Sequence, residues 1–166
     1  AIADILKLKG IDFQYVAGYS MGIYAALYTA GAYSFETGVG IINYAFNLVK
    51  ELSNKGDYGM GAFIGLTDSD LNKLIQENDL NAEIININNQ HSIVAAGLKD
   101  DIIRLITLAK EEGAMSAGEL TVNVPYHSKF LLNYAELFQN YLKTLRIDKI
   151  LSILLPVIAN NIVINF

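Results

Sequence analysis

Residues 13–31 read FQYVAGYSMGIYAALYTAG, and this order of residue types sets the architecture of the chain. The short apolar run Phe13–Ala17 predicts a buried strand. Ile23–Ala30 is rich in alanine and leucine and predicts a helix, which Gly31 ends at a C-cap position. Between strand and helix, residues 18–22 form a Gly-x-Ser-x-Gly turn, the context that a nucleophile elbow requires.

Ser20 stands at the centre of this turn. The two motif residues that flank it, Gly18 and Gly22, have to be small, because a sharp turn brings strand and helix close together. The serine Oγ is then held at the tip, near the positive end of the following helix, and the backbone N–H of Met21 points at an oxyanion that forms on an attacked carbonyl. As a bare pattern the motif is weak, since glycine and serine are common. The alternative is a tight turn whose serine has no chemical role.

A serine hydroxyl is a poor nucleophile near neutral pH and needs a base. The sequence offers two histidines, His91 and His127. His127 follows a predicted strand and the turn Val124–Tyr126, and it precedes a predicted helix, so it occupies the kind of loop position where catalytic groups lie. His91 falls in a polar turn, where an exposed histidine without a catalytic role is expected. A structural role for His127 is the alternative to the catalytic one.

The rest of the chain alternates between helical and strand periods. Helices are expected over residues 1–9 and over 34–52, the second with Ser34 as its N-cap and with Val39, Ile42, Phe46 and Val49 at helical spacing. A helix from Ser128 to Leu145 and a strand over Leu154–Ile164 end the chain. The fold class is therefore α/β.

The block 58–118 has an order of its own. Strand, helix, strand, strand, helix and strand are predicted in turn, which is a ferredoxin-like pattern. We expect it as an inserted small subdomain, with residues 1–57 and 119–166 forming the large α/β subdomain. The predicted ranges are Tyr58–Leu66, a helix from Thr67 or Ser69 to Gln76, Glu83–Ile87, Ile93–Ala96, Asp100–Glu112 and Ser116–Val122, with a polar turn over Asn88–Ser92.

Composition excludes several classes of site. Of 166 residues 52% are hydrophobic, which suffices for a core, and 12 basic against 17 acidic side chains leave a net charge of −5. That balance argues against nucleic-acid binding, which needs clustered Lys and Arg. The absence of cysteine excludes disulfides, a cysteine nucleophile and thiolate zinc sites, and two histidines cannot form a multi-histidine metal site.

No targeting or membrane segment is expected. Ala1–Gly10 carries Asp4, Lys7 and Lys9, unlike a signal peptide, and it lacks an initiator Met, so we expect a fragment of a longer protein. The most apolar run, Ile150–Ala159, falls short of the ~20 residues that cross a bilayer. A cytoplasmic location fits this pattern.

Several segments, in order, resemble one family. Residues 18–27, GYSMGIYAAL, resemble the GHSxGEYAAL segment of malonyl-CoA:acyl carrier protein transacylases and polyketide synthase acyltransferase domains. Residues 30–36 resemble the AGxLSFED that follows it. Further matches are residues 59–66 to GxMxAVxGL, 88–97 to N-x-PxQxVxSG, 122–128 to the V-x-x-x-x-HS segment that holds the catalytic histidine, and 156–160 to PVxSN.

This resemblance implies an α/β-hydrolase-like large subdomain with a ferredoxin-like insertion and a ping-pong acyl transfer. Ser20 attacks an acyl-coenzyme A thioester, His127 takes and returns the proton, and Met21 supplies an oxyanion donor. The phosphopantetheine thiol of an acyl carrier protein is the acceptor. Coenzyme A is a substrate, so no cofactor or metal is implied. The family's second oxyanion donor belongs to a loop that would precede residue 1.

Departures from the family pattern concern specificity. Malonyl-type enzymes place an arginine on the helix after the elbow, and the matching position here is Ala45, which disfavours a substrate with a free carboxylate. Tyr19 replaces a histidine beside the serine, and Ile23 replaces a glutamate. By the same resemblance, Tyr126 shapes the acyl pocket and Asn88 faces it.

Two other functions stay open from the sequence. Some relatives without the arginine act as hydrolases that clear stalled acyl chains from carrier proteins, and a degenerate domain would only dock. The chain could also belong to a multidomain synthase. An acidic carrier protein needs a basic patch, for which Lys129, Lys143 and Lys149 are candidates, although such lysines are more often an ordinary solvated face.

Overall fold

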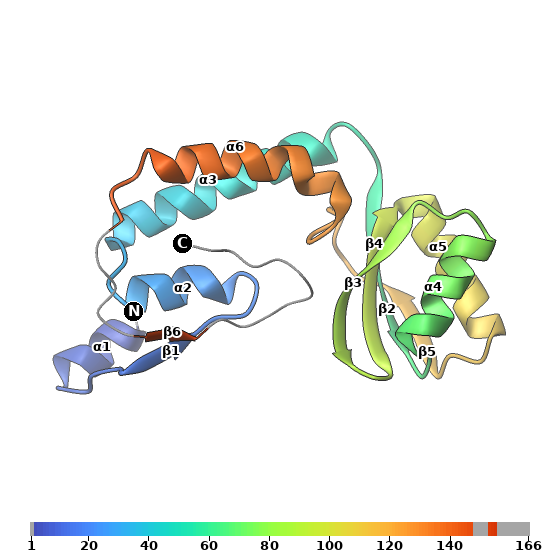
Figure 1. Cartoon of the computed structure of the whole chain (residues 1–166), viewed down its shortest axis with the longest axis horizontal. Coiled ribbons are helices and arrows are strands. Elements are labelled where there is room, and N and C mark those ends of the chain that lie inside the picture. The colour runs from blue at the N-terminus through green and yellow to red at the C-terminus, as the bar shows by residue number, and fades with distance from the viewer. Residues whose placement is uncertain (1, 148–152, 156–166) are drawn as a thin grey trace. The chain divides into compact units, whose positions relative to one another are not determined.

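The computed structural model describes residues 2–147 and 153–155. Its chain forms two compact units, Ala1–Phe46 with Phe138–Phe166 and Asn47–Leu137, whose helices and strands are labelled in Figure 1. The predicted subdomain borders at 57/58 and 118/119 stay a prediction.

The first unit holds the segment around Ser20. It contains α1 (Ile2–Leu8), β1 (Tyr15–Ala17), α2 (Gly22–Thr29), most of α3 (Phe35–Ser53), the end of α6 (Leu132–Lys143) and β6 (Ile153–Leu155). Strands β1 and β6 run parallel, with Tyr15 opposite Ile153 and Ala17 opposite Leu155. Parallel pairing of strands far apart in sequence, with a helix directly after β1, is the α/β arrangement expected from the sequence.

The core of the first unit lies where α2, α3 and α6 meet. Leu27, Ala32, Tyr33 and Ile41 are buried there, and side chains of α6 pack against them. The rings of Tyr44 and Tyr141 stack with centroids 4.0 Å apart, which fixes α6 along α3 within this unit.

Local signals explain where α2 ends and α3 begins. Gly31 has a φ of +83°, its N–H donates to the Tyr28 carbonyl, and the Ala32 N–H donates to the Leu27 carbonyl. These two bonds form a Schellman motif, which needs the left-handed conformation that glycine adopts most easily. The Ser34 Oγ then accepts from the Thr37 N–H at 3.2 Å and caps α3, as predicted.

The second unit contains one four-stranded antiparallel sheet in the order β3-β4-β2-β5. The order of elements along the chain and this strand order are those of a ferredoxin-like fold. The elements are β2 (Tyr58–Ile64), α4 (Asp68–Glu77), β3 (Ala82–Asn89), β4 (Ser92–Leu98), α5 (Lys99–Glu111), β5 (Ser116–Glu119) and the short 3₁₀ helix η1 (Lys129–Leu131).

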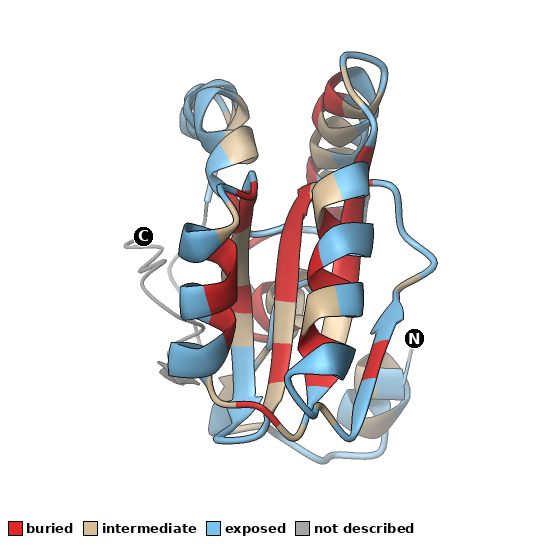
Figure 2. Cartoon of the chain, turned by 90° about the vertical axis from the view of Figure 1, so that its right-hand side faces the viewer, coloured by how far each residue is buried: buried red, intermediate tan, exposed pale blue. Residues whose placement is uncertain are grey.

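Helices α4 and α5 cover one face of this sheet, and Figure 2 looks onto them with the sheet behind. Phe63 of β2, Leu71 of α4 and Ile102 and Leu105 of α5 are completely buried between the helices and the sheet. A capping box starts α4, in which Thr67 and Asp70 each satisfy the other's backbone N–H. The opposite face carries a smaller buried cluster of Met60, Ile85 and Ala96.

Several boundaries differ from the prediction. The β3–β4 hairpin is tighter than expected, because Asn89 still pairs with Ser92 across the turn. Strand β5 ends at Glu119 rather than at Val122. The helix expected from Ser128 to Leu145 is divided into η1 and α6, and the Ser128 hydroxyl donates to the Pro125 carbonyl rather than capping η1.

The apolar face of α3 is also not the one that the spacing suggested. Val39, Ile42 and Phe46 are exposed, whereas Ile41, Leu48 and Leu52 are buried. Apolar residues recur on two sides of this helix, so periodicity alone did not select the side that packs.

Some predictions fall outside the described residues. These are the strand beyond Leu155, both ends of the apolar run Ile150–Ala159, and Lys149. Lys129 and Lys143 belong to different units, so the basic patch stays a prediction. Among the described helices, none combines the length and the apolar character that crossing a bilayer requires.

Candidate active site

Ser20 lies in a strained turn between β1 and α2. Its φ is +50°, in the left-handed region that non-glycine residues seldom adopt. The Gly22 N–H donates to the Tyr19 carbonyl at 2.8 Å and the Ile23 N–H to the Ser20 carbonyl at 3.1 Å, so the chain reverses direction within three residues. The serine side chain stands exposed on this bend.

The two glycines of the motif differ in their role. A Cβ on Gly18 would lie within 3.0 Å of the Gly22 carbonyl group and the Ile23 nitrogen, so no larger residue fits. A Cβ on Gly22 would meet nothing within 4 Å. The close approach of strand and helix therefore requires only the first glycine, and the expectation that both flanking residues must be small is wrong for the second.

Replacing Gly18 by alanine is expected to destabilise the fold by about 2 kcal/mol, because backbone atoms rather than a flexible side chain oppose the new methyl group. The free energy of unfolding of the matched variant Gly22→Ala should lie within about 1 kcal/mol of that of the parent, since alanine suits the first turn of a helix. Urea unfolding of both variants checks this pair. Equal stability of the two would contradict the steric account.

Met21 is the N-cap of α2, and its side chain makes no capping hydrogen bond. The first turn of α2 contains no acidic residue. The N–H groups of Gly22 and Ile23 already donate to carbonyls of the turn, so it is the dipole of α2 that favours an anion at this end. An oxyanion formed on a carbonyl attacked by Ser20 would meet this end of α2.

His127 lies on a loop of the second unit that is anchored on both sides. Pro125 before it is completely buried, and its carbonyl accepts the Ser128 hydroxyl at 2.6 Å. The Lys129 N–H donates to Glu83 of β3 at 2.7 Å. His127 itself has a φ of +61°, so it adopts the same left-handed backbone region as Ser20. The loop around His127 has to hold this strained conformation in place.

Partial burial of the imidazole lowers the pKa of His127 below its ordinary value of 6.5, although part of the side chain remains exposed. A histidine with a lowered pKa is neutral at physiological pH, and the neutral form is the one that accepts a proton from a hydroxyl group.

His91 lies in the β3–β4 turn and is exposed. Its backbone N–H donates to the Asn89 side chain, and its carbonyl accepts the Gly65 N–H, each at 2.9 Å. Its backbone therefore closes the turn, which agrees with a structural position.

The other predicted residues are divided between the units. Tyr19, half exposed, and Ala45, partly buried on α3, belong with Ser20 and Met21 to the first unit. Asn88 and Tyr126 belong with His127 to the second. Within each unit the structure places these residues, and the pairing of Ser20 with His127 stays a prediction. Asn88 is exposed, and its amide accepts from Asn86 at 2.5 Å and donates to Ser92 at 3.4 Å.

An apolar hollow adjoins the serine turn in the first unit and was not foreseen from the sequence. Its volume is about 460 Å³, and it lies between α2 and α3, with Met21 and Ala25 on one side and Val39 and Ile42 on the other. The signal that could have found it was available: Val39 and Ile42 form an apolar stripe beside the one that packs into the core.

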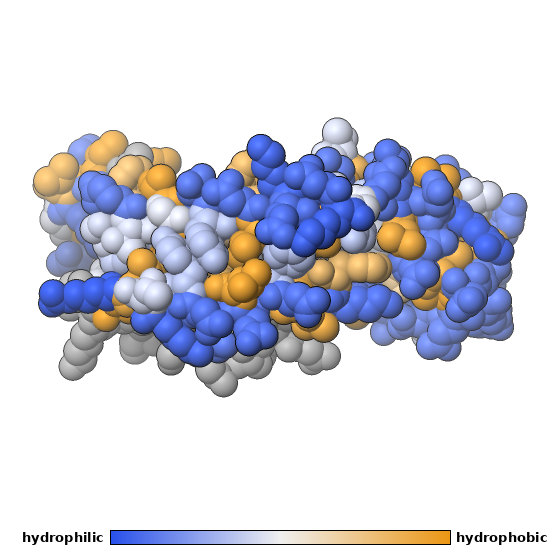
Figure 3. All heavy atoms as spheres, turned by 90° about the horizontal axis from the view of Figure 1, so that it is seen from above, coloured by the Kyte–Doolittle hydropathy of each residue, from blue (hydrophilic) through white to orange (hydrophobic). Residues whose placement is uncertain are grey.

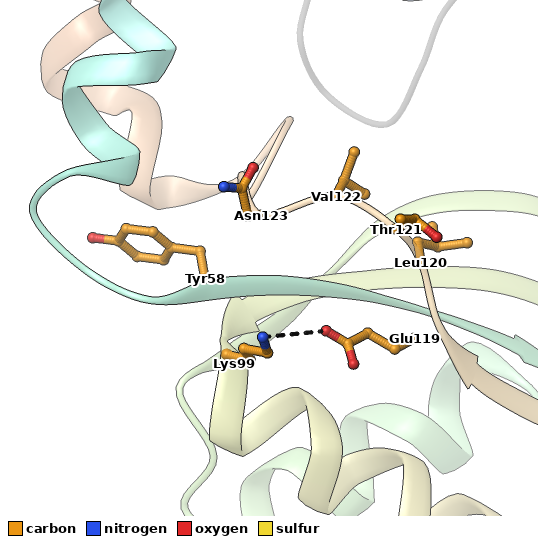
Figure 4. A pocket seen from close by; sticks show the side chains of 7 residues that line it. All are labelled: Tyr58, Lys99, Glu119, Leu120, Thr121, Val122 and Asn123. Carbon is orange, nitrogen blue, oxygen red and sulfur yellow. Dashed lines mark ion pairs between the residues drawn. The ribbon is translucent and has the colours of Figure 1, made fainter.

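A second cavity, of about 420 Å³, lies in the second unit and contains none of the predicted site residues. Lys99 and Glu119 form an ion pair of 4.0 Å at its edge, as Figure 4 shows. The side chain of Tyr58, the first residue of β2, and that of Asn123 lie on the opposite side of this strand. The strand β5 leads through its wall toward the loop of His127.

Comparison with known proteins gives a consistent result. The acyl transferase domain family matches residues 1–157. The chain is 31% identical over 163 residues to the polyketide biosynthesis malonyl CoA-acyl carrier protein transacylase BaeC of Bacillus velezensis, covering 96% of the chain and 54% of the relative. It is 32% identical over 140 residues to the malonyl CoA-acyl carrier protein transacylase of Bacillus subtilis, covering 82% and 44%.

The chain is also similar in fold to solved structures of the same kind of protein. FabD from Acinetobacter baumannii has a TM-score of 0.81 at 29% identity, covering 92% of this chain and 50% of that one. The malonyl CoA-acyl carrier protein transacylase from Coxiella burnetii has a TM-score of 0.83 at 28% identity, covering 92% and 49%. The chain spans about half the length of the relatives it matches. With nearly all of its length matched by the family, the chain belongs to the acyl transferase domain family.

Proposed function

We propose that this chain carries an acyl transfer site that moves an acyl group from acyl-coenzyme A to the phosphopantetheine thiol of an acyl carrier protein. The observation that carries the proposal is the strained, exposed turn of Ser20 directly before the N-terminus of α2. Relatives named as malonyl CoA-acyl carrier protein transacylases support it, as does a structural neighbour solved as a malonyl-transacylase in complex with an acyl carrier protein, with a TM-score of 0.84.

In the first half-reaction Ser20 Oγ forms a bond to the thioester carbonyl carbon while His127 takes its proton. The tetrahedral oxyanion is stabilised by the Met21 N–H and the positive end of α2. The carbon–sulfur bond then breaks, the proton on His127 passes to the departing coenzyme A thiolate, and an acyl-serine remains.

The second half-reaction repeats these steps with a different nucleophile. The carrier thiol gives its proton to His127 and its sulfur bonds to the acyl carbon. The bond to Ser20 Oγ breaks, and His127 returns the proton to the serine. Ser20, His127 and the two thiols account for every proton and acyl transfer, so this mechanism invokes no cofactor and no metal ion. The reaction belongs to fatty-acid or polyketide biosynthesis.

The experiment that tests the proposal follows the acyl group. The protein is incubated with radiolabelled acetyl-coenzyme A and then with a phosphopantetheinylated carrier protein. Label on the carrier supports transfer. Release of free acetate at the same rate with and without carrier would instead mean a hydrolase, and no label on either protein would mean a domain that only docks.

The lowered pKa of His127 gives the proposal a pH dependence. Because the base has to be unprotonated, acylation of Ser20 should fall as the pH falls. Since burial lowers the pKa of His127 below 6.5, the half-maximal rate should occur below pH 6.5. Pre-steady-state acylation rates between pH 5 and pH 8 measure this midpoint. A midpoint above the ordinary histidine value would contradict the assignment.

Ala45 gives the proposal a substrate preference. A malonyl carboxylate beside alanine would lack a counter-charge, so neutral acyl groups are the expected substrates. The variant Ala45→Arg should raise malonyl transfer by about 10- to 100-fold, the worth of a charge-assisted hydrogen-bonded pair, and leave acetyl transfer within about threefold.

The control for this substitution is Phe46→Arg, which adds the same charge at the next, exposed position of α3. It should leave the ratio of malonyl to acetyl transfer unchanged. Comparable rates for both substrates in the unaltered protein would refute the preference.

A further inference from the structure

The apolar hollow beside the serine turn has a neutral and largely exposed wall. Met21 is 73% exposed, Val39 50% and Ile42 42%, although each is a large hydrophobic side chain. Exposed apolar surface that is gathered in one concave place marks a binding site more often than scattered residues do. The face drawn in Figure 3, by contrast, is mostly hydrophilic, with hydrophobic residues in small separate groups.

The two tyrosines in the wall offer no charged group, and the hydroxyl group of one of them is already hydrogen-bonded. Tyr28 donates its hydroxyl to Asp4 at 2.7 Å, so its ring rather than its hydroxyl group is left for a ligand. Burial raises the pKa of Tyr24, which keeps that phenol uncharged. Among the residues that the structure describes, none with a charged side chain lines the hollow. Its chemistry suits an apolar, uncharged occupant and disfavours a carboxylate.

Two positions connect this hollow with the acyl group. Met21 follows Ser20 directly and lies in the wall, so the hollow adjoins the turn that holds the proposed nucleophile. On α3, Ala45 follows Ile42 by three residues and lies on the same side of the helix. A volume of about 460 Å³ is within the range of small-molecule pockets.

We infer that the hollow between α2 and α3 binds the alkyl chain of a neutral, medium-length acyl thioester, whose carbonyl carbon lies at Ser20. This inference rests on the proposed function and names its substrate class. Full burial of a methylene group would raise the specificity constant about fourfold, and an open hollow gives part of that. From acetyl to hexanoyl, kcat/KM should therefore rise about tenfold.

The test uses acetyl and hexanoyl thioesters of N-acetylcysteamine with the variant Val39→Asp. Val39 is half exposed, so a carboxylate there does not disturb the core. The variant should lose the advantage of hexanoyl over acetyl, which is read as the ratio of the two kcat/KM values. Ile103→Asp, an equally exposed position on α5 of the second unit, should behave like the parent.

Binding without chemistry separates this inference from the proposed function. Calorimetry of the Ser20→Ala variant should show hexanoyl thioester binding that Val39→Asp removes, whether or not the parent transfers acyl groups. An equal response to both thioesters, or a hexanoyl advantage that survives Val39→Asp, would overturn the inference. A parent that sediments as a dimer and a Val39→Asp variant that sediments as a monomer would instead assign the hollow to a second copy of the chain, and would overturn it too.

Discussion

Ser20→Ala is expected to lower acyl transfer by about 10⁴-fold or more, because it removes the only atom proposed to carry the acyl group. Alanine adopts the φ of +50° as poorly as serine does, so the substitution leaves the turn and its strain unchanged. The measurement is the steady-state rate of acyl transfer from acetyl-coenzyme A to carrier protein, compared at equal concentrations of folded protein.

The control for this variant is Ser69→Ala, an exposed serine on α4 of the second unit, which should retain the full rate. If Ser20→Ala kept more than one tenth of the parent rate, Ser20 would have no role as nucleophile. The alternative, a tight turn whose serine has no chemical role, would then be correct.

His127→Asn is the second large effect, with an expected loss of about 10³-fold or more in the rate of Ser20 acylation. Asparagine tolerates the positive φ that His127 adopts, so the loop is retained while the proton acceptor is removed. The rate should also lose its dependence on pH between 5 and 7, which a purely structural role of the histidine would not cause.

His91→Asn provides the matched control, because it makes the same chemical change in the exposed β3–β4 turn. It should leave both the rate and the pH profile as they are. A larger loss in His91→Asn than in His127→Asn would exchange the two assignments.

Much of the fold follows from local signals that the sequence displays openly. Gly31 ends α2 through two specific hydrogen bonds, Ser34 starts α3, and the Thr67–Asp70 pair starts α4. These signals act over four or five residues, so they can be read without tertiary structure. The ferredoxin-like order of strands likewise follows from the order of elements along the chain.

The errors arose where tertiary packing chooses between local options. Helix α3 has apolar residues on two sides, and only contacts with α2 and α6 decide that Ile41 is buried while Val39 and Ile42 remain exposed. The segment before α6 was expected to belong to the same α-helix, yet the chain forms the separate 3₁₀ turn η1 there, and the Ser128 hydroxyl donates to the Pro125 carbonyl.

The candidate site was predictable only where it depends on local structure. The turn of Ser20 is a local structure, and its steric need for Gly18 follows from the close approach of residues 18 and 22. The stripe of Val39 and Ile42 indicates a second apolar side of α3, but the hollow itself depends on how α3 packs against α2. The pairing of Ser20 with His127 depends on residues of two units and stays a prediction.

The most direct measurement is the mass of one peptide. Trypsin cleaves after Lys9 and Lys50, so residues 10–50 form a single peptide that holds Ser20 and one other serine, Ser34. After brief exposure of the protein to a mixture of acetyl-, hexanoyl- and malonyl-coenzyme A and an acid quench, this peptide should carry one acyl group. Fragment ions should place that group on Ser20, with hexanoyl predominant. An unmodified peptide, or an acyl group on Ser34, would contradict the account.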